Sequence, residues 1–295
     1  MSVSTAKTTH LDPFDVFCRA MLDQRLVPPS MRVDAPSARR ARVELGDFAG
    51  HVPYLPGDDL RFLDWKALAR SGQKRLRTFD EARHRRLVLV VDRSLSMASR
   101  REGLSWLLRL WCYLALYRLD SLDFVSLVGD GVRREVVAGP DAWNRMRAEL
   151  VSLELAGTAG LDAMTGYADL GRADQDAVIV SDFSPLESTI RLLDRAKSER
   201  RRLLLVFPRL PHEASANDLP AGPVSFFDPE TGQSFEVRLG SALHLAFLEE
   251  QRAWERRLAA ACADRGHALL VATLPKDEAE ALRIETWLPF LVAHR

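Results

Sequence analysis

The residues best suited to chemistry stand at the end of a short apolar run. Residues 87–91 read LVLVV and lead directly into Asp92, Ser94 and Ser96. A carboxylate and two hydroxyls, spaced by one residue, offer three hard oxygen groups at the mouth of a buried strand. Oxygen groups of this kind are the ligands that hard divalent cations prefer. The spacing therefore predicts a cation site at the carboxyl end of this strand.

A second strand-like run ends in the same way, because residues 178–180 are followed by Ser-Asp and place Asp182 at a strand end. In open α/β sheets, ligands bind beyond the carboxyl ends of the strands where the winding reverses. If the two strands are neighbours, the carboxylates of Asp92 and Asp182 converge there. Two like charges in one crevice either raise a pKa or require a cation, and Mg²⁺ with part of its water shell is the simplest solution. Thr158, in the small-residue loop AGTAG, is placed to add a third hydroxyl.

The elements that must position these residues alternate along the chain from residue 87 onward. Short apolar runs alternate with amphipathic helical stretches, which is typical of strands joined by crossover helices. We expect an α/β fold with a doubly wound, mostly parallel sheet over residues 87–295. The predicted strands are 87–91, 123–130, 176–183, 203–207 and 268–272, with helices at 102–120, 141–154, 186–201 and 242–264.

Two segments depart from this alternation. Residues 132–138 follow a Gly-Asp-Gly turn closely enough to predict an antiparallel hairpin partner for residues 123–130. Residues 208–240 carry five prolines, and we expect an inserted loop with a hairpin of 224–227 against 234–239. Residues 1–86 are predicted to form a smaller N-terminal segment with one helix near residues 13–26.

Composition excludes several classes of partner and compartment. The 295 residues hold 41 basic and 41 acidic side chains, so no overall field would attract nucleic acid or anionic lipid. Cys18, Cys112 and Cys262 are far apart and odd in number, which favours a reducing compartment over a disulfide framework. We find no signal peptide, and the apolar stretch 104–119 is interrupted by Arg109 and too short to span a bilayer. These features predict a cytoplasmic protein without a membrane span.

The same residues carry a resemblance. Asp92, Ser94 and Ser96, followed by a loop threonine and a strand-end aspartate, resemble the metal-ion-dependent adhesion site (MIDAS) of von Willebrand factor type A (vWA) domains. The upstream segment VPYLPGDDLRFLDWKALAR, residues 52–70, and RTFDEARHRR, residues 77–86, are similar to the bacterial domain of unknown function 58 family.

This resemblance implies a vWA-like, Rossmann-like domain and a function. The direct or water-bridged ligands of Mg²⁺, Mn²⁺ or Ca²⁺ would be Asp92, Ser94, Ser96, Thr158 and Asp182. An open coordination position would accept a carboxylate from a protein partner. Members of the family often accompany MoxR-type AAA+ ATPases, which implies an adaptor or chaperone-like module.

Purely structural roles are also open for these residues. Asp and Ser at a strand end are also common turn and capping residues, and such a site can keep its residues without the ion. The upstream motif supplies paired acids beside arginines, which favour a salt-bridged architectural role over catalysis. Its residues, of unknown role, are Gly57, Asp58, Asp59, Arg61, Asp64, Trp65 and Arg70.

Enzyme classes lack their usual parts in this chain. The sequence contains no HExxH, no GxSxG and no GxxxxGK[ST], so we expect no enzymatic activity. One alternative stays open, a Mg²⁺-dependent phosphatase-like enzyme with Asp92 as nucleophile and Asp182 holding the ion. Such enzymes usually carry a second acid two residues after the nucleophile, and that position is Ser94 here.

Overall fold

The computed structural model describes residues 12–24, 26, 48–54, 60–79, 86–119, 121–129, 131–158, 160–165, 176–214, 222–227 and 231–292. The chain divides into two compact units. The larger unit combines Met1–Arg32 with Arg85–Arg295, and the smaller unit is Val33–His84. Each unit is described by itself.

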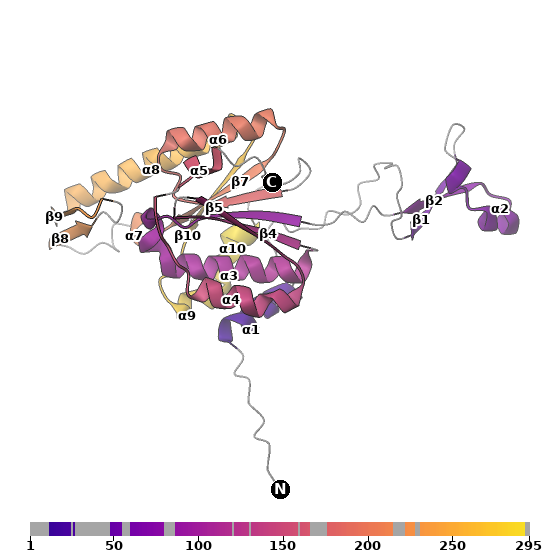
Figure 1. The fold of residues 1–295 in the computed structure, drawn as a ribbon, viewed down its shortest axis with the longest axis horizontal. Helices are drawn as coiled ribbons and strands as arrows, with labels where there is room; N and C mark the ends of the chain where they lie inside the picture. Colours follow the sequence, from indigo (N-terminus) through magenta and orange to yellow (C-terminus); the bar gives the residue numbers. More distant parts are fainter. Residues whose placement is uncertain are drawn as a thin grey trace, which may run out of the picture. The chain divides into compact units, whose positions relative to one another are not determined.

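The larger unit is built on a six-stranded sheet with the order β10-β7-β6-β3-β4-β5 (Figure 1). Its strands are β3 (Arg86–Asp92), β4 (Ser121–Val128), β5 (Gly131–Val137), β6 (Asp176–Val180), β7 (Leu203–Arg209) and β10 (Ala268–Thr273). All neighbouring pairs are parallel except β4 with β5, which are antiparallel. The predicted α/β fold with a mostly parallel sheet is confirmed, as is the hairpin partner at residues 132–138.

The winding of the sheet reverses at β3. From β3 the chain moves to β4 and β5 on one side, and then returns to β6 on the other side. Strand β3 is therefore central, and its residues 87–92 are all buried. A strand covered on both faces needs an uninterrupted apolar run, which is what residues 87–91 supply. The carboxyl ends of β3 and β6 thus form the switch point where α/β sheets bind ligands.

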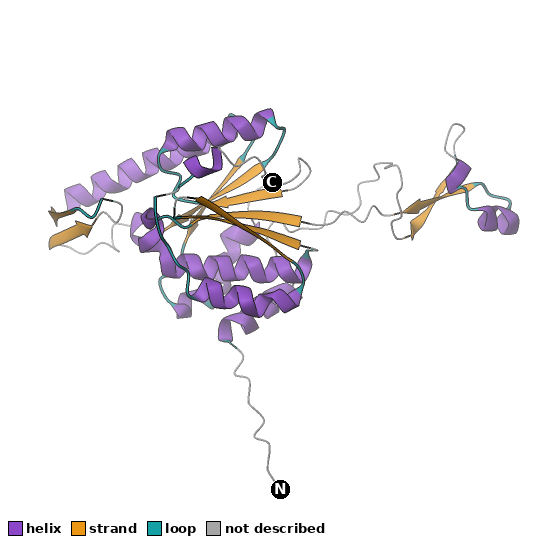
Figure 2. Ribbon diagram, viewed as in Figure 1, coloured by secondary structure: helices purple, strands orange, loops and turns teal. Residues whose placement is uncertain are grey.

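Helices cover both faces of the sheet (Figure 2). Leu87, Leu89 and Val91 pack in one core cluster with residues of α3 (Arg101–Arg118) and α4 (Trp143–Val151). Val88 and Val90 point to the opposite face, into a cluster with residues of α6 (Leu186–Ser198) and α8 (Ser241–Ala263). This alternation follows from the two-residue period of a strand. The remaining helical elements are η3 (Leu95–Arg100), η4 (Pro140–Ala142), α5 (Asp162–Thr165), α7 (Pro211–Ala214), α9 (Glu278–Ala281) and α10 (Ile284–Val292).

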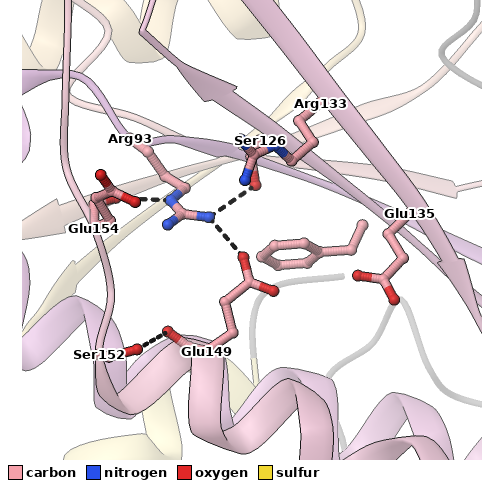
Figure 3. Close-up of a pocket in the computed structure, with 8 residues that line it drawn as sticks. Arg93, Ser126, Arg133, Glu135, Glu149, Ser152 and Glu154 are labelled. Atoms are coloured by element: carbon pink, nitrogen blue, oxygen red, sulfur yellow. Dashed lines mark hydrogen bonds and ion pairs between the residues drawn. The ribbon is translucent and has the colours of Figure 1, made fainter.

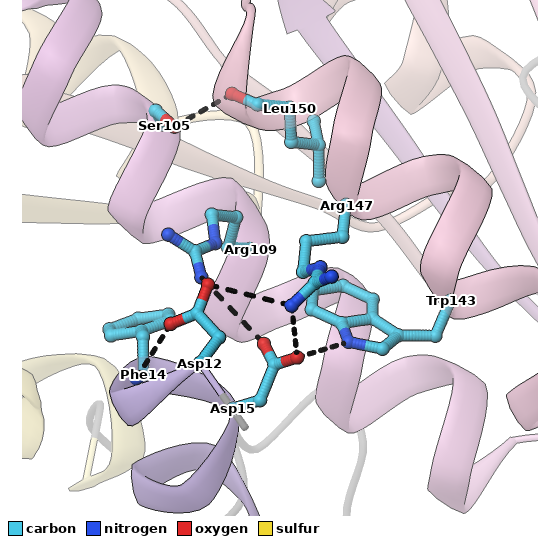
Figure 4. Close-up of polar contacts among 8 residues, drawn as sticks. All are labelled: Asp12, Phe14, Asp15, Ser105, Arg109, Trp143, Arg147 and Leu150. Atoms are coloured by element: carbon cyan, nitrogen blue, oxygen red, sulfur yellow. Dashed lines mark hydrogen bonds and ion pairs between the residues drawn. The ribbon is translucent and has the colours of Figure 1, made fainter. Parts of the chain in front are cut away.

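Helix α1 (Pro13–Asp23) belongs to the larger unit, although its residues precede the smaller unit in the chain. Arg109 of α3 is buried and forms ion pairs with Asp12 and Asp15 (Figure 4). Asp15 also accepts hydrogen bonds from Arg147 and from the indole of Trp143. We predicted one N-terminal segment over residues 1–86, whereas the structure separates α1 from the rest of it. The physical reason is that α1 buries Phe14, Cys18 and Met21 in the core cluster that contains α3, and that Asp12 and Asp15 pair with the buried charge of Arg109.

The smaller unit contains a two-stranded antiparallel sheet of β1 (Phe48–Pro53) and β2 (Arg75–Phe79). In the chain, η2 (Leu60–Phe62) and α2 (Trp65–Ser71) lie between β1 and β2. A second hairpin, within the larger unit, pairs β8 (Gly222–Phe227) with β9 (Ser234–Leu239), as the sequence predicted. Within the described ranges, no helix combines the length and the apolar character that crossing a bilayer requires.

Candidate functional site at the ends of strands β3 and β6

Asp92 closes β3 as a buried acceptor, with only 1% of its surface exposed. Its Oδ1 accepts a hydrogen bond of 3.0 Å from the backbone N–H of Ser94, and its Oδ2 accepts one of 2.7 Å from the hydroxyl of Ser181. Burial raises the pKa of Asp92 above its ordinary value, and the charge of Asp182 adds to this increase. The donors from Ser94 and Ser181 act in the opposite direction. Desolvation therefore dominates, and burial disfavours the charged form of this carboxyl group.

The two predicted serine ligands lie beside each other. Ser94 is buried, Ser96 is half-buried, and their Oγ atoms are 2.9 Å apart. Both follow β3 immediately, at the start of η3, so the chain needs no long loop to present them. The structure brings these hydroxyls to the same strand end as Asp92.

Strand β6 brings Asp182 to the same edge. Val91 is paired with Val180 in parallel register, which confirms that the two strands are neighbours. Asp182 is half-buried, and its Oδ1 accepts a hydrogen bond of 3.1 Å from the N–H of Ser184. The next residue, Phe183, is buried with φ of 57°, a conformation that non-glycine residues rarely adopt. Its N–H donates to the Ser181 hydroxyl and its carbonyl accepts from Thr189, so the turn is held at both ends.

The loop with Thr158 is held against the strand end by backbone bonds. The N–H of Ala156 donates to the carbonyl of Arg93 at 2.9 Å, and the N–H of Leu95 donates to the carbonyl of Gly157 at 2.9 Å. Gly157 has φ of 75°, and a Cβ there would lie 2.2 Å from the carbonyl oxygen of Gly129. Only glycine permits this crossing of two loops.

Thr158 itself is exposed. Within the described part of the chain, no hydrogen bond joins its hydroxyl to the other four predicted ligands. Gly160, two residues later, lies nearer to the site, since a Cβ on it would be 3.8 Å from Oδ2 of Asp92. The structure thus brings the loop to the site, where hydrogen bonds join Asp92, Ser94, Ser96 and Ser181. Asp182 lies near enough for its charge to raise the pKa of Asp92.

Ser181 is the site residue that the sequence prediction missed. It is fully buried, and its hydroxyl joins Asp92 on β3 to the turn after β6. Its only sequence signal is its place directly before the strand-end Asp182. That signal could have been used, because parallel register sets the residue before Asp182 opposite Asp92.

The donor set consists of two carboxylates and serine or threonine hydroxyls. Among the described residues, no group of three or more His, Cys, Asp or Glu side chains is placed to hold a metal ion. A site built here must therefore rely on hydroxyls and water for most of its ligands, as suits Mg²⁺ more than Zn²⁺. The buried charge of Asp92 and the nearby charge of Asp182 fit a cation, because a cation stabilises both.

Arg93 lines a separate polar pocket, where its side chain lies beside Ser126 and Glu149 (Figure 3). The guanidinium is buried; its Nε donates to the carbonyl of Glu154 and its Nη1 to the Glu149 carboxylate, both at 2.9 Å. The pocket of about 300 Å³ is lined by Arg93, Phe124, Ser126, Arg133, Glu135, Glu149, Ser152 and Glu154. None of the five predicted ligands lines it. The hydrogen bonds of Arg93 instead link the end of β3 to α4 and to the loop that leads to Thr158.

The upstream motif is described in part. Gly57, Asp58 and Asp59 lie outside the described residues. Asp64 caps α2 by accepting from the N–H of Ala67 at 2.9 Å, and its Oδ2 lies 2.6 Å from Nε2 of His51. The hydrogen bond from Ala67, followed by that from His51, lowers the pKa of Asp64 to about 2.

The other described motif residues are Arg61, Trp65 and Arg70. The guanidinium of Arg61 lies 5.9 Å from the ring centroid of Phe62, while Trp65 and Arg70 are exposed. The contacts of Asp64 therefore support an architectural role within the smaller unit.

Comparisons with known proteins support the family assignment. None of the curated proteins matches the chain. Among solved structures, the chain is similar to one titled "Crystal Structure of the SpRpn10 VWA domain", at 11% identity and a TM-score of 0.33. That match covers 67% of this chain and 92% of the other, and is too distant to bear on function. The family model described as "Protein of unknown function DUF58" matches residues 51–257, so the chain belongs to this family.

Proposed function

We propose that the chain is a protein-binding module that captures its partner through a divalent cation at the ends of β3 and β6. The observation that carries this proposal is the buried Asp92 carboxylate, placed beside two serine hydroxyls and near the charge of Asp182. The residues that would hold the ion are Asp92, Ser94, Ser96, Thr158 and Asp182, with Ser181 orienting Asp92. A bound Mg²⁺, Mn²⁺ or Ca²⁺ would supply positive charge and an open coordination position for a partner's carboxylate.

Energetics favour a cation over a simple turn. A capping aspartate is usually exposed enough to keep its solvation, whereas Asp92 is 1% exposed and faces a second acid. Such a charge is costly to maintain at neutral pH without a counter-ion. The protein residues alone would hold the ion weakly, so a partner's acidic side chain adds both affinity and specificity.

The partner class is inferred from the family. We propose a cytoplasmic adaptor or chaperone-like role with a MoxR-type AAA+ ATPase, as the family resemblance implies. The overall charge balance of the chain supports a protein partner over nucleic acid.

Binding is favoured over catalysis by the residue two positions after Asp92. Phosphatases that use an aspartate nucleophile usually carry a second acid there, and this chain has Ser94. We therefore propose that the protein is not an enzyme. Mg²⁺-dependent turnover of a generic phosphoester, abolished in Asp92→Asn, would instead favour the phosphatase alternative.

The test is partner binding by the double variant Ser94→Ala, Ser96→Ala. A purified MoxR-type ATPase from the same source is titrated against the parent chain, with Mg²⁺ or with chelator. We expect chelator and the double variant each to weaken binding by at least about 30-fold, the order of loss when a buried charged contact is removed. Ser99→Ala is the control, because Ser99 is exposed on the same short helix. Equal binding by all proteins, with chelator making no difference, would refute the mechanism.

A further inference from the structure

The β8–β9 hairpin has an apolar face that the protein leaves exposed. Phe226 is paired with Phe235 and Val224 with Val237, so these four side chains share one face. The two phenyl rings stack with centroids 5.6 Å apart, yet Phe226 is 38% and Phe235 is 57% exposed. Leu243 and Phe247, on the first turns of α8, are also exposed. A lone two-stranded sheet is marginally stable in water, whereas a sheet of three or more strands is stable, so we expect further strands to extend this hairpin.

The outer edge of β9 is the one open to such strands. Among the described residues, β8 and β9 pair only with each other. Strand β8 contains Pro223, which lacks an N–H and is typical of a protected edge. Strand β9, with the sequence SFEVRL, contains no proline.

The sequence of β9 is complementary to itself. If two copies of β9 pair antiparallel about a two-fold axis, the apolar faces stay on one side of the joined sheet only when the axis passes through a residue. An axis at Glu236 sets glutamate against glutamate, and one at Arg238 sets arginine against arginine. An axis at Val237 sets Glu236 of each copy opposite Arg238 of the other copy, which gives two pairs of opposite charge. Opposite charges in directly facing positions stabilise strand pairs, and like charges destabilise them.

We infer that two copies of this chain associate through β9, with the axis at Val237. The hairpins join into one four-stranded sheet whose apolar face carries both Phe226–Phe235 pairs, one on each side of the central pair of Val237 residues. This interface involves none of the residues of the candidate cation site. It stands independently of the proposed function.

The test is the mass of the full-length chain in solution, measured by light scattering or sedimentation over a range of concentrations. We expect the parent chain to dimerise. Glu236→Arg alone and Arg238→Glu alone set like charges opposite each other, and each should weaken dimerisation about tenfold or more. A mixture of the two single variants should form a heterodimer, because every facing pair is then opposite in charge. The double variant Glu236→Arg, Arg238→Glu should dimerise like the parent.

Each variant must also keep its fold, which the melting temperature checks. Both positions are exposed, so the fold should change little. A parent chain that stays monomeric at all concentrations would overturn the proposal. Single variants that dimerise as the parent does, or a mixture that fails to associate, would overturn it as well.

Discussion

Asp92 and Asp64 are two aspartates of the same chain in opposite electrostatic environments. Asp92 ends a central strand and is buried, so desolvation raises the pKa of its carboxyl. Asp64 begins a short helix in the smaller unit, where the N–H of Ala67 and the ring of His51 lower the pKa of its carboxyl to about 2. Both accept a backbone N–H and a side-chain hydrogen bond, so the count of partners does not explain the difference.

The difference lies in solvation and in neighbouring charge. Asp64 keeps its contact with water and has a histidine beside it, so its charge is already stabilised. Asp92 has lost water, has an acid nearby and, among the described residues, accepts hydrogen bonds from neutral donors, so its charge is poorly stabilised. A carboxylate with unbalanced charge at the carboxyl end of a strand is a candidate for function, whereas a balanced one at a helix start fits a capping role.

The largest expected effect is on thermal stability in the presence of metal. At a concentration about 100 times Kd, Mg²⁺ or Mn²⁺ should stabilise the parent by about 2.7 kcal/mol, which is roughly 5–10 °C in Tm. Asp92→Asn should abolish this response. Its metal-free Tm should be no lower than that of the metal-free parent, because the substitution removes a buried charge. Thermal melts with chelator and with millimolar metal measure both effects.

The matched control for that experiment is Asp64→Asn. Its carboxylate caps a helix of the smaller unit, so the response to metal should remain as in the parent. If the Tm of the parent does not change with metal, Asp92 is not a metal ligand and does not differ from Asp64 in this respect.

A smaller effect is expected from Ser181→Ala. The substitution removes the donor to Oδ2 of Asp92 and the acceptor of the Phe183 N–H, which should cost about 1–2 kcal/mol of stability without metal. Because the Ser181 hydrogen bond lowers the pKa of Asp92, its loss raises that pKa further and weakens metal binding. Chemical denaturation and metal titration measure these changes. The exposed Ser184→Ala serves as the control, and identical behaviour of the two variants would exclude a role for Ser181.

The smallest effect is on titration, observable by NMR of the side-chain carboxyl groups. Asp64 should titrate near pH 2 and Asp92 above 3.8, on opposite sides of the ordinary value. The folded state therefore loses the Asp64 contribution to stability as pH falls from 3.8 through about 2. For Asp92 the sign is reversed, because its contribution is present at low pH and is lost as pH rises through its folded pKa.

His51→Ala sharpens this titration. It should raise the pKa of Asp64 only part of the way to 3.8, because the larger effect comes from the N–H of Ala67, which remains. A pKa of Asp92 at or below the ordinary value would contradict the description of that site.

Local pattern alone determined much of this protein. The apolar run before Asp92 predicts a buried central strand, and the strand-helix alternation predicts a mostly parallel sheet. The hairpin of β8 and β9 was also predicted, from its turn residues and its two apolar runs. These predictions succeed because strand, helix and turn preferences depend on residues within a few positions of one another. The upstream motif likewise predicted the family.

Only the tertiary structure added Ser181 to the site and placed α1 in the larger unit. Ser181 became part of the site because β6 lies beside β3 in a register that sets it against Asp92. Helix α1 joined the larger unit because its apolar side chains pack in the core cluster that contains α3 and because Asp12 and Asp15 pair with Arg109, which lies 97 residues from Asp12. The burial that raises the pKa of Asp92 comes from packing on both faces of the sheet. Contacts between distant residues depend on how whole helices and strands pack. The same packing decides which charged groups are removed from water. Neither can be deduced from the spacing of nearby residues.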